Sequence, residues 1–152
     1  MDPVALRLLN QQLASPKFQT PDEVVNYMCA VQAQDYRMMR WAVAMRTRNP
    51  SSRAFTRAFD EGRMIRLHLM RGTWQLVSAA NYGWLLDLCA PKAIAAIKGW
   101  MRSNGISISD EELADVREVI VGTAESKRSA TKEDFVQALA ERDLFLEDRR
   151  LS

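Results

Sequence analysis

The sequence predicts a mainly α-helical fold with a small β-hairpin: a winged helix-turn-helix, followed by helices and the start of a second winged helix. Two observations lead to this prediction. Apolar residues recur at helical spacing behind clear capping signals up to about residue 61, and the period then changes to two over residues 65–77. Helix, helix, turn, helix and hairpin is the order of elements in a winged helix.

Start signals place the first two helices. Asp2 followed by Pro3 predicts an N-cap and a first helical residue, and Ser15-Pro16 is expected to end that helix. The segment Thr20-Pro21-Asp22-Glu23 combines an N-cap, an N1 proline and a capping-box glutamate. A third helix is expected over about residues 35–46, with an apolar stripe that we expect to be buried: Met38, Trp41, Ala42 and Met45.

A fourth short helix and a hairpin complete the predicted unit. Residues 51–61 would pack Phe55 and Phe59 inward and expose Arg53 and Arg57, with Gly62 as the C-cap. Two runs of alternating residues then flank Gly72, which can supply the positive φ of a tight turn. In helix-turn-helix proteins the helix before the wing reads the groove, so we expect one DNA-facing side.

The remaining chain is predicted to be helical, with a helix boundary at Pro91 and new starts at Ser109 and Thr131. We therefore predict three segments: a first winged-helix domain over residues 1–90, a helical connector over 91–128, and the beginning of a second, truncated winged helix over 129–152. The four tryptophans occur at helical or strand spacing, which favours positions in the core.

The charge distribution favours a polyanionic partner. Between residues 37 and 72 nine arginines face two acids, a net charge of +7, whereas residues 109–152 carry twelve acids and seven bases. A basic stretch of this kind is the electrostatic footprint of a nucleic-acid-binding face, and guanidinium groups suit bidentate phosphate contacts. A solvated helical surface would give the same composition, so charge alone leaves both interpretations open.

Several other classes are disfavoured. Cys29 and Cys89 form no CxxC pair, His68 is the single histidine, and no P-loop or GxGxxG motif occurs, so no metal and no cofactor are expected. The apolar runs are short and no signal-peptide pattern is present, which favours a reducing cytoplasm, no membrane partner, and thiols packed as small apolar groups.

Two segments carry a resemblance to a known family. They are Val31-Gln32-Ala33-Gln34-Asp35, with Arg37 and Trp41 after it, and the run from Arg66 through Gly72 and Trp74 to Lys92. The chain resembles the N-terminal part of the AlkZ-like winged-helix DNA glycosylases. The resemblance covers most of residues 1–95 and, more weakly, the helix at Thr131. Family members are longer, so we expect a truncated or shortened relative, and its length leaves open whether it is active.

The resemblance implies a protein that binds double-stranded DNA and removes alkylated purines, including crosslinked bases. Such a protein would be cytoplasmic and associated with the nucleoid. Family members use a Gln-x-Gln or Gln-x-Asp pair, which matches Gln32 and Gln34 here as the catalytic residues. The basic residues of the expected DNA-facing side are then the candidate DNA contacts: Arg37, Arg40, Arg53, Arg57, Arg66, His68 and Arg71.

The chemistry sets a geometric condition on the two glutamines. A purine alkylated at N7 leaves readily, so a neutral glutamine carbonyl that orients water can be sufficient. Side chains two residues apart diverge on a straight helix but converge on an extended backbone. We therefore predict a helix end or irregularity between Val31 and Asp35. Asp35 could stabilise developing positive charge or cap the following helix.

Two alternatives remain open. The chain could be a noncatalytic winged-helix DNA-binding protein, such as a regulator, or a helical protein-interaction module whose basic face meets an acidic partner. A truncated last winged helix would also expose Phe135, Phe145 and Leu146, which leads to the hypothesis of self-association through the incomplete C-terminal part.

Overall fold

A computed structural model describes residues 2–144 of the chain. The chain forms two compact units, Met1–Ile97 and Lys98–Ser152. The sequence predicts a different division, into three segments with boundaries at residues 90 and 128. Those boundaries separate winged-helix domains, which the two compact units do not define, so the three segments stay a prediction. None of the helices in residues 2–144 has both the length and the apolar character needed to cross a membrane.

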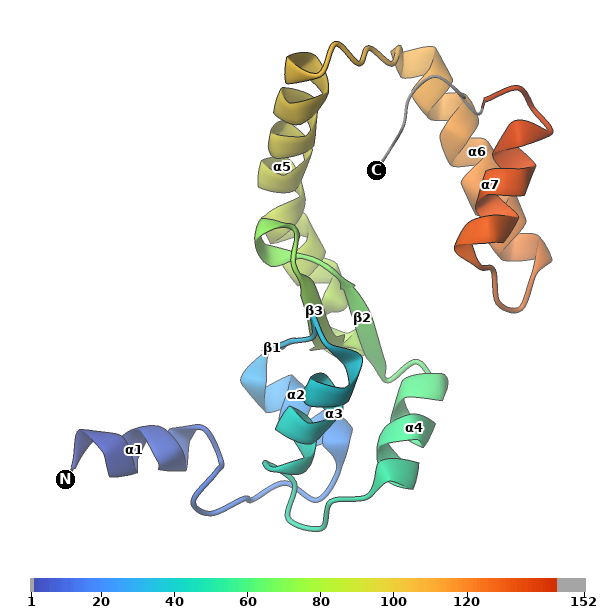
Figure 1. The fold of residues 1–152 in the computed structure, drawn as a ribbon. Coiled ribbons are helices and arrows are strands. Elements are labelled where there is room, and N and C mark those ends of the chain that lie inside the picture. The colour runs from blue at the N-terminus through green and yellow to red at the C-terminus, as the bar shows by residue number, and fades with distance from the viewer. Residues whose placement is uncertain (1, 145–152) are drawn as a thin grey trace. The chain divides into compact units, whose positions relative to one another are not determined.

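The first unit has the element order of a winged helix (Figure 1). Its elements are α1 (Pro3–Asn10), α2 (Pro21–Met28), β1 (Ala30–Gln32), α3 (Tyr36–Ala44), α4 (Ser52–Asp60), β2 (Met64–His68), the 3₁₀ turn η1 (Met70–Gly72), β3 (Trp74–Ser78) and most of α5 (Ala79–Ser103). The fold class predicted from the sequence is confirmed. The helix starts at Pro3 and Pro21 are confirmed too, although α1 ends at Asn10, before the expected Ser15-Pro16 stop.

A three-stranded antiparallel sheet holds the hairpin in place. The strand order is β1-β3-β2, so β3 is the central strand. The turn at the hairpin tip places Arg71 at φ 54° and Gly72 at φ 71°, as a tight turn with a glycine requires. The short strand β1 was not predicted as a strand. It pairs Gln32 with Gln75 and so ties the segment after α2 to the hairpin.

Each face of the sheet is covered by a different set of helices. Val31, Met64 and Leu76 belong to a buried cluster with residues of α2, α3 and α4. On the other face Val77 packs with Leu85 of α5 in a second cluster, to which Cys29 and Cys89 contribute as partly buried groups. The packing expected for the two thiols is therefore confirmed, and burial on both faces fixes the register of β3.

The predicted buried face of α3 is wrong for three of its four residues, whereas Ala42 does pack against the core. Met38, Trp41 and Met45 are exposed by 62%, 63% and 46%, whereas Met39 and Val43 are buried. The helix carries apolar residues nearly all round, so its sequence offers two stripes at helical spacing. Packing against α2 and β1 selects the stripe that contains Met39 and Val43.

Two further expectations are corrected in α5 and among the tryptophans. The helix boundary expected at Pro91 is absent, because α5 continues through it. Pro91 and Asp87 are both exposed, so water can satisfy the carbonyl that loses its donor. The core positions expected for the tryptophans are wrong for three of them: Trp41 is 63% exposed and Trp84 and Trp100 are each 50% exposed.

The second unit contains α6 (Asp110–Ser126) and α7 (Lys132–Ala140). Both predicted starts are confirmed, because Ser109 and Thr131 each form a capping box with the residue at the third helical position. Within residues 98–144 Val119 is the one buried side chain. Phe135 is partly buried, and Phe145 and Leu146 lie outside the described residues.

Candidate functional site

The segment that carries both glutamines is not helical: Gln32 ends β1, and Gln34 lies in a bend that follows it. No helix passes through it: α2 ends at Met28, Cys29 takes φ 64°, and α3 begins at Tyr36. The predicted break in the helix is therefore confirmed, although α2 ends earlier than expected. Val31 and Ala33 are buried while Gln32 and Gln34 are exposed. Burial thus alternates along these four residues, and both glutamines reach the same open depression.

The two glutamine side chains differ in their hydrogen bonds. The backbone N–H of Trp74 donates to Oε1 of Gln34 at 3.4 Å. A backbone N–H can bond to the amide oxygen but not to the amide nitrogen, so this contact sets which way the Gln34 amide lies. Among the described residues no group hydrogen-bonds the side chain of Gln32. The pair therefore offers one fixed amide and one free amide.

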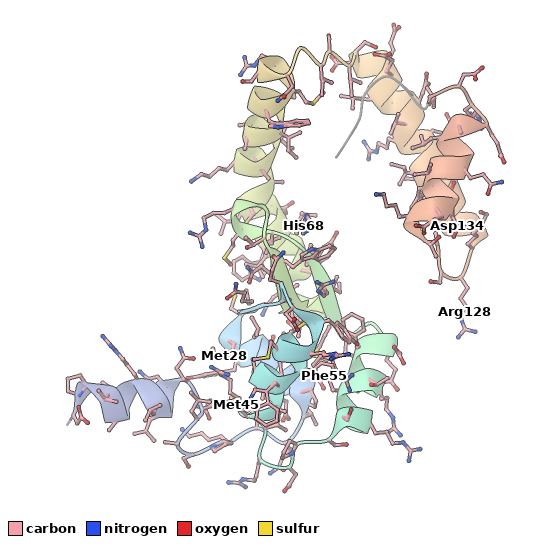
Figure 2. The ribbon with its side chains drawn as sticks, viewed as in Figure 1. Met28, Met45, Phe55, His68, Arg128 and Asp134 are labelled. Carbon is pink, nitrogen blue, oxygen red and sulfur yellow. The ribbon has the colours of Figure 1, made fainter. Side chains whose placement is uncertain are left out.

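Both glutamines line an open depression beside α3. Its apolar wall includes Met28 and Met38, and its polar groups include Gln11, Asp35 and Arg46. Met28 lies at the end of α2, facing α3 (Figure 2). Open access and mixed polar and apolar lining suit a water molecule and part of a larger ligand.

Asp35 is a helix cap. Its Oδ1 accepts the backbone N–H of Arg37 at 2.8 Å and that of Met38 at 2.9 Å, which satisfies two of the free donors at the start of α3. Of the two roles weighed from the sequence, capping is the one for which the structure supplies contacts.

Arg46 is a member of the depression that sequence reasoning did not assign to the site. Its Nη1 donates to the carbonyl of Ala42 at 2.7 Å and its Nη2 to Oε1 of Gln11 at 2.8 Å. Burial lowers the pKa of its guanidinium. No signal in the sequence distinguishes Arg46 from the other eight arginines of the basic stretch, because its place beside the glutamines follows from the packing of α3 on β1.

The remaining basic residues separate into groups. Arg37 and Arg40 line one depression near the start of α4, and Arg53 and Arg57 line an adjoining depression that shares Pro21 and Ser51 with the first. Arg37, Arg53 and Arg57 are exposed, whereas Arg40 bonds the Ser52 hydroxyl and lies 5.5 Å from the Phe55 ring centroid. These four arginines form a continuous basic surface, hereafter the α3–α4 surface.

Arg71 does not lie on the α3–α4 surface. It is in the turn at the tip of the hairpin, whereas α4 precedes the opposite end of β2. A five-residue strand separates the two, a distance of about 17 Å. Arg71 therefore marks a second basic position, and the single DNA-facing side expected from the sequence stays a prediction. Arg63 lines the same depression as Arg53 and Arg57, but its charge is paired with Asp22 at 2.5 Å and with Glu61 at 3.0 Å.

Arg66 and His68 lie on the hairpin beside Trp74. The guanidinium of Arg66 lies 4.1 Å from the Trp74 ring centroid, and the His68 ring packs edge-on against the same tryptophan at 4.0 Å. His68 remains exposed on the hairpin (Figure 2). Among residues 2–144 no three His, Cys, Asp or Glu side chains are grouped so that they could hold a metal ion.

Comparison with known proteins places this site in a family. The profile described as DNA glycosylase AlkZ-like matches residues 25–150, which include both glutamines, the α3–α4 surface and the hairpin. The chain belongs to the AlkZ-like DNA glycosylase family. It is similar to a Streptomyces sahachiroi protein named interstrand DNA cross-link repair glycosylase, with 26% identity over 121 residues.

The structural comparison agrees with the family assignment. The solved structure of Streptomyces sahachiroi DNA glycosylase AlkZ matches 93% of this chain with a TM-score of 0.70 and 26% sequence identity. The match covers 37% of that chain, and the curated relative is covered over 33% of its length. The chain thus spans about a third of the length of each AlkZ-like relative that it matches.

Proposed function

We propose that the chain binds double-stranded DNA and hydrolyses the N-glycosidic bond of alkylated purines, including bases in interstrand crosslinks. One observation carries the proposal: Gln32 and Gln34 are both exposed on a non-helical segment and line one open depression, in a member of the AlkZ-like family. The crosslink substrate is suggested by the name of the Streptomyces sahachiroi relative.

The proposed reaction needs little from the protein. A purine alkylated at N7 is cationic, so the bond from C1′ to N9 breaks with the electron pair passing to the purine. Water forms the new bond to C1′ and releases a proton to solvent. The glutamine carbonyl oxygens accept hydrogen bonds from that water and hold it against C1′. The fixed amide of Gln34 and the free amide of Gln32 can both supply such an oxygen.

The α3–α4 surface is proposed to hold the DNA backbone. Its exposed guanidiniums have no carboxylate partner among the described residues, so phosphates can pair with them. Arg71 at the hairpin tip would contact the backbone at a separate point. His68, exposed beside Trp74, is retained as a candidate contact. A protein with this function would act on the nucleoid in the cytoplasm.

The test is release of 7-methylguanine from alkylated duplex DNA. Replacing Gln34 or Gln32 with Ala should reduce the release rate by about a hundredfold, the size of effect that follows when a reacting group is misplaced by about 1 Å. The matched control is Gln137→Ala, which removes an exposed glutamine of α7 in the second unit. Equal rates for all four proteins would contradict the assignment of the two glutamines.

Other outcomes identify the alternatives. Duplex binding without base release by the unmodified chain would favour a noncatalytic DNA-binding protein. Absence of duplex binding at low salt would favour the protein-interaction module. We further propose self-association through the C-terminal part, where Phe135 is partly buried. A strictly monomeric species in light scattering at high concentration would contradict that proposal.

A further inference from the structure

Arg66 makes its hydrogen bonds within the protein. Its backbone lies in β2 and pairs with Leu76 of the central strand, and its side chain reaches the residues that follow β1. Its Nε donates to the carbonyl oxygen of Ala33 at 2.9 Å, and its Nη2 donates to that of Gln34 at 3.4 Å. Two successive carbonyls of the glutamine segment are thus held by one guanidinium.

Trp74 closes the same arrangement from the central strand. Its ring lies against the guanidinium of Arg66, its carbonyl accepts the N–H of Ala33 at 2.9 Å, and its own N–H donates to Oε1 of Gln34. The ladder between β1 and β3 therefore continues beyond Gln32, with the Gln34 side chain in place of a backbone acceptor. Arg66 fixes the backbone of Gln34 while Trp74 fixes its amide.

We infer that Arg66 is a positioning residue for Gln34 rather than a DNA contact, an inference that rests on the proposed function for its link to catalysis. Two of the five N–H donors of Arg66 bond these carbonyls, and its guanidinium lies against the indole, so the protein fixes the guanidinium before any phosphate is bound. Arg53 and Arg57 have no such interactions, so they are free to bind phosphate without a change in the protein. The guanidinium of Arg66 instead holds the Gln34 amide at one position in the depression.

The first test uses amide hydrogen exchange of the full chain and needs no DNA. In Arg66→Lys the charge is kept, but an ammonium cannot bond both carbonyls and stack on Trp74 as the planar fork does. The N–H groups of Ala33 and Trp74 should exchange about tenfold faster or more. Amides that pair β2 with β3 are the internal reference, since general destabilisation would accelerate them equally. The matched control is Arg71→Lys in the turn of the same hairpin.

The second test measures duplex binding over a salt series. In Arg66→Gln the slope of log affinity against log salt should stay that of the unmodified chain, whereas Arg57→Gln should lower its magnitude by about 1. In the base-release assay Arg66→Lys should lower kcat about tenfold and leave KM unchanged, because positioning acts on the reaction rather than on binding.

These readouts separate the inference from the proposed function. If the unmodified chain releases no base, the proposed catalysis fails, and the exchange data still decide whether Arg66 positions Gln34. Unchanged exchange at Ala33 and Trp74 in Arg66→Lys would overturn the inference. A salt slope lowered by about 1 in Arg66→Gln would overturn it also, because Arg66 would then contact a phosphate.

Discussion

The two compact units of the chain are stabilised in different ways. The first unit buries side chains on both faces of a sheet, in two clusters that contain Leu76 and Val77. In the described part of the second unit one side chain, Val119, is buried; the helix starts are held by capping boxes, and exposed ion pairs add to them. The first unit carries the basic stretch and the second is acidic.

This difference indicates which unit can hold a site whose side chains must be placed precisely. A candidate site that depends on one water and one amide needs rigid support, which burial and a strand ladder supply. Helices that rest on caps and exposed ion pairs are easily displaced, since each such contact contributes at most about 1–2 kcal/mol. The glutamine pair and its supports all lie in the unit with the continuous core.

The largest expected effect is a cavity in the first unit. Leu76→Ala should lower the free energy of unfolding by about 2–5 kcal/mol, because a fully buried Leu side chain leaves a void under the sheet. Val119→Ala, its counterpart in the second unit, should cost roughly 1–2 kcal/mol. Urea unfolding followed by circular dichroism measures both. Equal losses would contradict the difference in burial between the two units.

The second prediction concerns DNA binding by the α3–α4 surface. Replacing both Arg53 and Arg57 with Gln should lower the salt slope of duplex binding by about 2, since each contributes one phosphate contact. The matched control replaces Arg128 and Lys132 with Gln, which removes two exposed cations from the acidic unit; Arg128 lies beside α7 (Figure 2). A similar fall in the control would mean that binding follows net charge alone.

A third prediction compares equivalent caps. Thr20→Ala and Thr131→Ala each remove a capping box and should each cost about 1 kcal/mol. The two variants should differ, however, in how much helix they lose. Helix α2 contains Val24 and Val25, which are fully buried, so it stays folded, whereas α7 contains no buried residue and should lose helical content. The ellipticity at 25 °C distinguishes them, and an equal loss of helix in both variants would contradict the comparison.

The smallest effect is expected in acid. The hydrogen bond from Lys127, together with that from the Thr131 N–H, lowers the pKa of Asp134 from 3.8 to about 2. Asp134 lies at the start of α7 (Figure 2). Its contribution is therefore present above pH 3.8 and is lost as pH falls toward 2. Helical content should decline slightly over that range.

Asp134→Asn should remove this acid dependence, whereas Glu133→Gln in the same first turn should leave it in place. Circular dichroism titrations of the three proteins provide the measurement. An unchanged titration in Asp134→Asn would mean that this carboxylate does not support α7.

Much of the local structure could be read from the sequence because its causes are local. The capping boxes at Thr20, Ser109 and Thr131 involve residues three apart, so neighbours in the chain decide them. The hairpin followed from alternation and from Gly72. A break in the helix at Gln32 and Gln34 could be required on chemical grounds, and the structure has it.

Long-range packing decided the rest. The sequence of α3 offers two apolar stripes, and contact with α2 and β1 buries the one with Met39 and Val43. The nine arginines are alike in sequence, yet folding pairs Arg63 with acids, places Arg46 beside the glutamines, and ties Arg66 to the carbonyls of Ala33 and Gln34. The sequence by itself determined which elements form and the charge they carry. Only the tertiary structure decided which guanidiniums are free for a phosphate, because each acceptor that occupies one is brought to it by the fold.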